Sequence, residues 1–310
     1  MLPQILAINL WNPEHVSGWL LIVVLSLILG MVHGITPDEH TWPITFSYAI
    51  GSYSTKKGLK AGLIFSAAFT LQRAIASELA YLGLSRLYTL SGINNFVYVG
   101  VGLLMGIAGL FIVKRSSILH FDLPFIKAHK SFNARSDNQS WLQDPRPWMP
   151  AVHGFIAGWG FGAFALILYT VLAPATHSAA FGWVPGALFG IGTMVVQMLA
   201  GALFGYIAVR RGLSQDSIRK VALKTAGNTL TWGGLAFVLG GLFGIIFPAA
   251  ANFGLSTGFH IHNLSHLGIA FGLVIFCVVV VGFTTLVIET RSELKKLKPD
   301  FQSTVTKNST

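Results

Sequence analysis

The sequence GMVHGITPDEHTW, residues 30–42, decides how this chain folds. It places two imidazoles and two carboxylates at the end of a long apolar run that carries no charge: His33, Asp38, Glu39 and His40. Ionisable side chains at membrane depth are costly, and they usually have a function. Imidazole and carboxylate together suit a divalent first-row metal ion. The stretch therefore predicts a membrane helix that ends at a polar site, and it favours a metal crossing a membrane over a soluble enzyme.

The composition is that of a multi-pass membrane protein. The chain is 53% hydrophobic and 10% charged, against about 25% charged residues in soluble domains, and its mean hydropathy is +0.64. Cys277 is the only cysteine, which excludes a disulfide framework or a thiolate cluster within one chain. Residues 1–15 carry Glu14 and no Lys or Arg, so we expect no cleaved signal peptide and a first apolar segment that stays in the membrane.

Seven segments are long enough to cross a bilayer as helices, which takes about 20 residues each. They lie near 16–35, 60–84, 93–113, 149–174, 182–209, 225–249 and 264–288. An eighth apolar stretch, 43–52, is too short to cross and predicts an interfacial or re-entrant helix. The expected fold is an all-α polytopic membrane protein with about seven transmembrane helices.

The basic residues predict the orientation. If the N-terminus is outside and the C-terminus inside, 19 of the 21 Lys and Arg residues fall on one side, with Arg73 inside a span and Arg86 outside. This is the pattern of the positive-inside rule. It also explains the net charge of +10 without a nucleic-acid partner. The predicted organisation is a first transmembrane half, a cytoplasmic loop, a second transmembrane half and a basic cytoplasmic tail, at 1–114, 115–148, 149–290 and 291–310.

A short repeated tripeptide suggests that the two halves of the chain are related. The tripeptide VHG occurs at 32–34, in the first predicted span, and again at 152–154, at the start of the fourth. Many secondary transporters contain inverted repeats. With three spans in each copy, the second copy would be inverted, which predicts a 3+3 repeat followed by one C-terminal helix.

Two interpretations of residues 33–40 remain open. Thr36-Pro37-Asp38-Glu39 has the form of a capping box with proline at the first helical position, so the acids could simply neutralise a helix N-terminus. A capping box does not need a histidine on each flank, however. A helix broken at Pro37 would expose carbonyl groups and converging side chains, which is a recurring way to build an ion site.

Three further polar residues lie within or at the ends of predicted spans. Arg73 and Glu78 are in the second span, and an unpaired cation at the centre of a membrane costs several kcal/mol. We expect Arg73 to pair with a carboxylate on another span, Asp38 or Glu39, or to line a wet cavity. It is either half of a packing ion pair or a contact for an anionic substrate. His153 begins the fourth span, on the side where the first span ends, and it is expected to approach His33 or to be a packing residue.

HGITPDEH resembles the signature of the nickel/cobalt transporter families, including their urease-associated and efflux branches. The segment SYSTKKGLKAGLIF, residues 52–65, is similar to the same group. The resemblance implies that His33, Asp38 and His40 select the metal and that the fold is a three-plus-three bundle. It also implies a mild preference for efflux. The Gly-His-Ser motif of those families is replaced here by Ala68-Phe69-Thr70.

The expected function is therefore a transporter of divalent transition-metal cations in the cytoplasmic membrane, nickel or cobalt first. The metal would be the substrate, and no resident cofactor is expected. Substrate contacts are predicted at His33, Asp38, Glu39, His40, Arg73, Glu78 and His153. The first alternative is an exporter of anions or small organic acids, similar to sulfite exporter-like proteins, with Arg73 as the substrate contact. An intramembrane metalloenzyme is a weaker alternative, because it needs denser histidine boxes or a His-Glu-x-x-His helix. The oligomeric state stays open.

Overall fold

The computed structural model describes residues 16, 18–36, 38–84, 93–113, 144–160, 162–209, 213–251, 254–257 and 266–297. Its α-helices are α2 (Trp19–Ile35), α3 (Trp42–Gly51), α4 (Thr55–Leu79), α6 (Ile93–Val113), α7 (Met149–Ala157), α8 (Ala163–Ile167), α9 (Val184–Val209), α10 (Gln215–Ile246), α11 (Pro248–Ala251), α12 (Ile269–Val274) and α13 (Thr284–Leu297). Three π-helical segments, η1 (Ala80–Leu84), η2 (Leu168–Leu172) and η4 (Ile275–Phe283), extend α4, α8 and α12, and η3 (Pro174–Thr176) is a 3-10 turn. Strands β1 (Leu255–Ser256) and β2 (His266–Leu267) form a small antiparallel pair.

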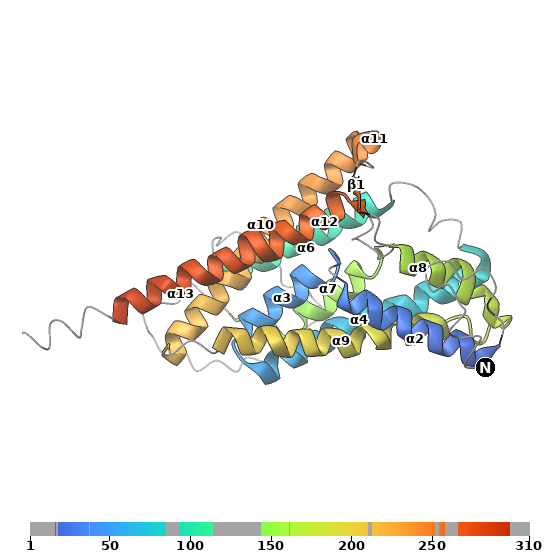
Figure 1. Cartoon of the computed structure of the whole chain (residues 1–310), viewed down its shortest axis with the longest axis horizontal. Helices are drawn as coiled ribbons and strands as arrows, with labels where there is room; N and C mark the ends of the chain where they lie inside the picture. The colour runs from blue at the N-terminus through green and yellow to red at the C-terminus, as the bar shows by residue number, and fades with distance from the viewer. Residues whose placement is uncertain are drawn as a thin grey trace, which may run out of the picture.

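The helices form one elongated bundle, which confirms an all-α membrane protein (Figure 1). Within the described part of the chain, four helical segments are long and apolar enough to cross a membrane: Ile93–Val113, Val184–Ile207, Gln215–Ile246 and Ile269–Lys296. Two shorter apolar helical segments, Trp19–Ile35 and Phe164–Thr176, lie beside them. The total of seven spans remains a prediction. Much of the predicted loop at 115–148 and the end of the basic tail lie outside the described residues.

The helix contacts of the first half of the chain correspond to those of the second half. Helix α4 lies along α9, and α6 lies along α10. Helix α2 packs on α9 as α7 packs on α4. Glycines allow both of the latter contacts, because Gly30 of α2 faces the backbone of Phe189 and Gly154 of α7 faces the backbone of Phe65. Exchanging α2 with α7, α4 with α9 and α6 with α10 maps these pairs onto one another, which is the arrangement that an inverted 3+3 repeat produces.

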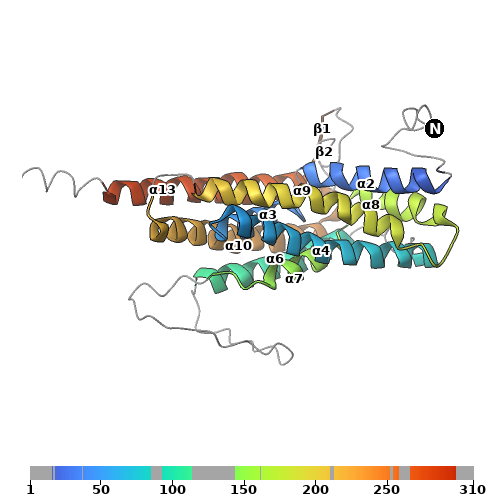
Figure 2. The ribbon, with the colours of Figure 1, turned by 90° about the horizontal axis from the view of Figure 1, so that it is seen from below.

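Two sequence predictions need correction. Of the two alternatives for 43–52, an interfacial or a re-entrant helix, the interfacial one is wrong, because all residues from Pro43 to Gly51 of α3 are buried, against α10, α9 and α4. Figures 1 and 2 show that α3 follows α2 along the long axis of the bundle, so α2 and α3 are two parts of one broken helix. The predicted span 149–174 is also broken, since α7 ends at Ala157 and α8 begins at Ala163. Three glycines, Gly158, Gly160 and Gly162, lie in or beside this second break.

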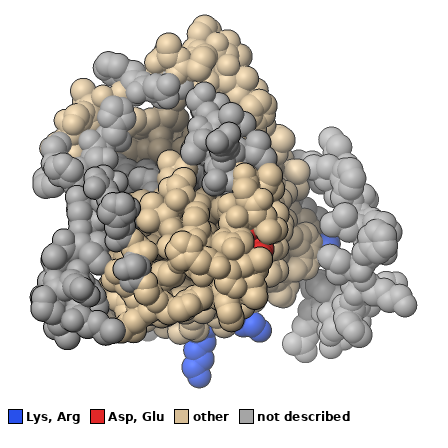
Figure 3. All heavy atoms as spheres, turned by 90° about the vertical axis from the view of Figure 1, so that its right-hand side faces the viewer, with Lys and Arg blue, Asp and Glu red and all other residues tan. Residues whose placement is uncertain are grey.

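One end of the bundle carries most of the described basic residues. Helices α4 and α10 begin and α13 ends there, at the left of Figure 1, with Lys56, Lys57, Arg219, Lys220, Lys224, Lys295 and Lys296. Ion pairs join these elements, among them Lys224 Nζ to Glu289 Oε2 at 2.7 Å. Figure 3 looks at the opposite end, where few charged side chains show among the described residues. This basic end is the end that the positive-inside rule predicts to be cytoplasmic.

We predict that Gly62 of α4 cannot be enlarged without loss of stability. A Cβ atom there would lie 3.0 Å from the carbonyl carbon of Gln197 on α9, and overpacking of this kind costs about 1–3 kcal/mol. Gly62→Ala should lower the midpoint of thermal unfolding in detergent. Gly106→Ala is the matched control, because a Cβ atom added at Gly106 would have no neighbour within 4 Å. Equal midpoints for the two variants would show that the α4–α9 contact is looser than described.

A candidate metal centre where two broken helices meet

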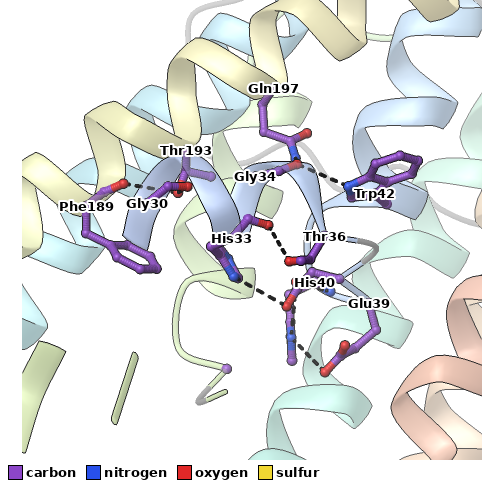
Figure 4. A network of polar contacts seen from close by, with 12 residues as sticks. Gly30, His33, Gly34, Thr36, Glu39, His40, Trp42, Phe189, Thr193 and Gln197 are labelled. Atoms are coloured by element: carbon purple, nitrogen blue, oxygen red, sulfur yellow. Dashed lines mark hydrogen bonds and ion pairs between the residues drawn. The ribbon is translucent and has the colours of Figure 1, made fainter. Parts of the chain in front are cut away.

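Helix α2 ends inside the bundle, and its last carbonyl groups are bonded to side chains. The Thr36 hydroxyl donates to the His33 carbonyl oxygen at 3.1 Å. The Trp42 indole N–H donates to the Gly34 carbonyl oxygen at 3.2 Å, from the start of α3 (Figure 4). The end of a helix leaves its final carbonyls without intrahelical partners, and within a membrane such groups must be satisfied by protein. Thr36 and Trp42 therefore provide hydrogen-bond donors for carbonyl groups at the end of α2.

Helix α9 supplies two more donors to the same helix end. The Thr193 hydroxyl donates to the Gly30 carbonyl oxygen at 3.0 Å. The Gln197 amide donates to the Gly34 carbonyl oxygen at 3.3 Å, and Figure 4 shows both side chains reaching toward α2. Gln197, which lies in an otherwise apolar span, is thus explained by the break in α2.

The turn between α2 and α3 is closed by Asp38 and not by a capping box. The backbone N–H of His40 donates to Asp38 Oδ1 at 2.9 Å, and the N–H of Trp42 donates to the Asp38 carbonyl oxygen at 3.0 Å. Helix α3 begins at Trp42, with Pro43 in its first turn. The predicted capping box at Thr36 to Glu39 is therefore wrong, because the Thr36 side chain bonds backward to the preceding helix. Pro37 lies outside the described residues.

The break gathers the four predicted residues into one cluster, which we call the acid–imidazole cluster: His33, Asp38, Glu39 and His40. His40 Nδ1 lies 3.2 Å from Glu39 Oε1 and 3.7 Å from Asp38 Oδ1. His33 Nδ1 lies 3.7 Å from Asp38 Oδ2. All four residues are no more than 4% exposed. One ligand atom each from Asp38, Glu39 and His40 fits within 4.8 Å, which is a spacing suited to a single metal ion.

Tyr98 of α6 completes the cluster and was not found from the sequence. Its hydroxyl donates to Glu39 Oε1 at 2.9 Å, and its ring stacks on that of His40 with centroids 5.3 Å apart. Loss of a group that orients a metal ligand typically lowers metal affinity by about 10- to 100-fold. The one sequence signal for Tyr98 as a site residue is its polar hydroxyl group within an apolar span.

The second break lies against the first. A Cβ atom on Gly160, between α7 and α8, would overlap the imidazole ring of His40. The same glycine binds Arg73, whose Nη2 donates to the Gly160 carbonyl oxygen at 3.1 Å. Arg73 Nη1 donates to the Tyr169 hydroxyl at 2.8 Å. Among the described residues no acid forms an ion pair with Arg73, so the predicted pairing with Asp38 or Glu39 is wrong. A carbonyl oxygen and a phenol replace the carboxylate.

Aromatic rings lie between Arg73 and the cluster. The Phe69 ring is stacked on His33, with centroids 5.8 Å apart, and the Arg73 guanidinium carbon lies 4.6 Å from the centroid of the same ring. Phe189 likewise contacts both, at 5.2 Å from His33 and 5.6 Å from Arg73. Cation–π contacts of this kind stabilise a buried guanidinium. Arg73 is therefore held outside the cluster by aromatic faces.

The other two predicted site residues lie apart from the cluster. His153 Nδ1 is 3.0 Å from the Tyr48 hydroxyl and 3.0 Å from the Met149 carbonyl oxygen, and the Leu104 backbone is a further neighbour. These polar contacts of His153 are thus with α3, α7 and α6, and none of them is with His33. Glu78 is half-buried on α4, beside Trp183 in a pocket lined mainly by apolar residues. The structure thus joins four of the seven predicted residues and separates Arg73, His153 and Glu78 from them.

The described residues thus form a multi-pass helical membrane bundle with buried polar groups at two facing helix breaks. A family model described as the cytochrome c biogenesis protein transmembrane region matches residues 67–236, which is more than half of the chain. The chain belongs to this permease-like membrane family. The matched part contains α6, α7 and α9 with Arg73 and the second break, whereas the acid–imidazole cluster precedes it. Comparison with curated proteins and with solved structures gave no match.

We predict that the Tyr169 hydroxyl stabilises the buried charge of Arg73. Hydrogen bonds to charged groups contribute about 1.5–3 kcal/mol, so Tyr169→Phe should lower the midpoint of thermal unfolding. Thr170→Val is the control, since Thr170 is exposed and bonds only within its own helix.

A double-mutant cycle separates this bond from general packing. In an Arg73→Met background, Tyr169→Phe should lower the midpoint of thermal unfolding much less, because no guanidinium is then left without its acceptor. An equal cost in both backgrounds would contradict the assignment.

Proposed function

We infer that the protein transports divalent transition-metal cations across the membrane, with nickel and cobalt as its substrates. The observation that carries this proposal is the acid–imidazole cluster. Two carboxylates and an imidazole place ligand atoms within 4.8 Å of one another, buried at a helix break. Borderline ions such as nickel and cobalt bind imidazole well, and carboxylates balance their charge.

The donor set fits transport better than permanent binding. Three ligand groups from one short turn, with His33 Nδ1 at 3.7 Å from Asp38 Oδ2, leave a coordination sphere that is not filled by the protein. An ion held in this way keeps positions for water and dissociates readily. The ion is thus the substrate, and the proposal includes no resident cofactor and no enzymatic reaction. The outward direction of transport rests on the resemblance to the efflux branch of the nickel/cobalt families.

The anion alternative has less support from the geometry of Arg73. Its two terminal nitrogens already donate to Gly160 and Tyr169, and aromatic rings contact its guanidinium group. An anion would have to displace these contacts to reach the charge. A thiol–disulfide relay within this chain is excluded by chemistry, because it needs two cysteines and only Cys277 is present.

We predict that purified protein in liposomes moves radioactive nickel or cobalt, and that Asp38→Asn and His40→Ala lower the initial rate by at least about tenfold, because each removes a ligand. Two matched variants serve as controls. Asp216→Asn and His177→Ala change the same residue types at exposed positions and should keep the wild-type rate.

The contrary result is equally specific. Sulfite or another small anion that moves in an Arg73-dependent way, with no flux of either metal, would overturn the metal assignment. It would make the anion exporter the function of this fold.

A further inference from the structure

Helix α3 carries a row of buried polar groups that the acid–imidazole cluster does not use. Thr41, Thr45 and Tyr48 are spaced by four and three residues, so they share one face of the helix. Thr41 and Thr45 are no more than 2% exposed, and neither hydroxyl oxygen has a hydrogen-bond partner among the described residues. Leaving a buried hydroxyl unbonded is costly, which indicates that this face meets a ligand or water.

Neighbouring hydroxyls show that this arrangement is not a general feature of the bundle. Ser47, on the opposite side of α3, donates to the Pro43 carbonyl oxygen at 2.7 Å. Thr225 and Thr229 of α10 bond in the same way to carbonyls four residues back, each at 2.8 Å. Such bonding satisfies a hydroxyl inside a helix. Thr45 could make the same bond and does not, so its oxygen stays available.

The row ends at a histidine with one ring nitrogen held and the other open. His153 Nδ1 lies 3.0 Å from the Met149 carbonyl oxygen and 3.0 Å from the Tyr48 hydroxyl. A carbonyl oxygen only accepts, so the hydrogen bond to Met149 places the proton on Nδ1, and the Tyr48 hydroxyl lies beside the same N–H. With the proton on Nδ1, His153 Nε2 carries a lone pair. This nitrogen is buried without a hydrogen bond to a described side chain, and the Leu104 backbone of α6 is a further polar neighbour of the ring. Metal-binding imidazoles have this arrangement, in which the second nitrogen donates to a carbonyl.

The row leads from the cluster toward the basic end. Helix α3 begins directly after His40 and ends at Gly51, close to the start of α4 with Lys56 and Lys57. In Figures 1 and 2, α3 points away from α2 along the long axis of the bundle. From Trp42 to Tyr48 the helix rises by about 9 Å. His153 therefore lies between the acid–imidazole cluster and the predicted cytoplasmic surface.

We propose that Thr41, Thr45, Tyr48 and His153 form the path by which the divalent cation travels between the acid–imidazole cluster and the basic end, with His153 Nε2 as a second, transient ligand. The proposal rests on the metal transport proposed above. The threonine hydroxyls replace water around the moving ion, and Tyr48 holds the His153 ring in the orientation that presents Nε2.

The test separates binding from movement. In liposomes loaded for nickel or cobalt flux, Thr45→Val and His153→Leu should each lower the rate by about tenfold or more, whereas equilibrium binding of cobalt should change less than about twofold, because the cluster keeps its ligands. Ser47→Ala on the opposite face of α3 is the matched control and should alter neither quantity. Asp38→Asn should lower both the metal flux and the equilibrium binding of cobalt.

A second measurement does not depend on the metal. In a Cys277→Ser background, a cysteine introduced by Thr45→Cys should react with a small cationic methanethiosulfonate reagent at least about tenfold faster than one introduced by Ser47→Cys, since a reaction rate reports access to water and ions. Equal reaction rates, or wild-type metal flux in Thr45→Val and His153→Leu, would overturn the path while leaving the transporter intact. Absence of metal binding and flux in the wild type would instead overturn the transport proposal, and the cation path with it.

Discussion

The structure depends on one constraint, which is that a backbone inside a membrane must find its hydrogen-bond partners within the protein. Helix α2 stops in the middle of the bundle, where water does not replace a lost turn of helix. Carbonyl groups in its last two turns accept hydrogen bonds from Thr36, Trp42, Thr193 and Gln197. These four side chains come from α9 and from both sides of the break. The polar cluster exists because the chain can interrupt a helix at this depth without leaving its carbonyls unbonded.

The general fold could be predicted from the sequence because hydrophobic length and charge asymmetry act over whole segments. The span predicted at 93–113 coincides with α6, and the one predicted at 182–209 nearly coincides with α9. The second break was missed because Gly158 to Gly162 lies in a continuously apolar stretch, and small residues there also suit close helix packing. Hydropathy does not distinguish a packed glycine from an unwound one.

The cluster was predicted in part, and the limits have physical causes. Asp38, Glu39 and His40 are neighbours in sequence, so a single turn suffices to bring their ligand atoms together. Tyr98 lies 58 residues beyond His40, and its contact with Glu39 depends on how α6 packs. Arg73 was expected to find a carboxylate because an isolated buried cation is costly. The structure meets that need with a phenol, a carbonyl oxygen and aromatic faces, a combination that no spacing in the sequence reveals.

Gly160 has a mechanical consequence. A Cβ atom on Gly160 would overlap the ring of His40, and the Gly160 carbonyl oxygen accepts a hydrogen bond from the Arg73 guanidinium. A single residue without a side chain thus connects the second half of the chain to the cluster formed by the first half. If α7 and α8 rotate about their break, His40 must move and Arg73 must exchange its acceptor in the same step. The contacts of Gly160 therefore link any movement at the second break to the imidazole ring of His40 and to the guanidinium group of Arg73.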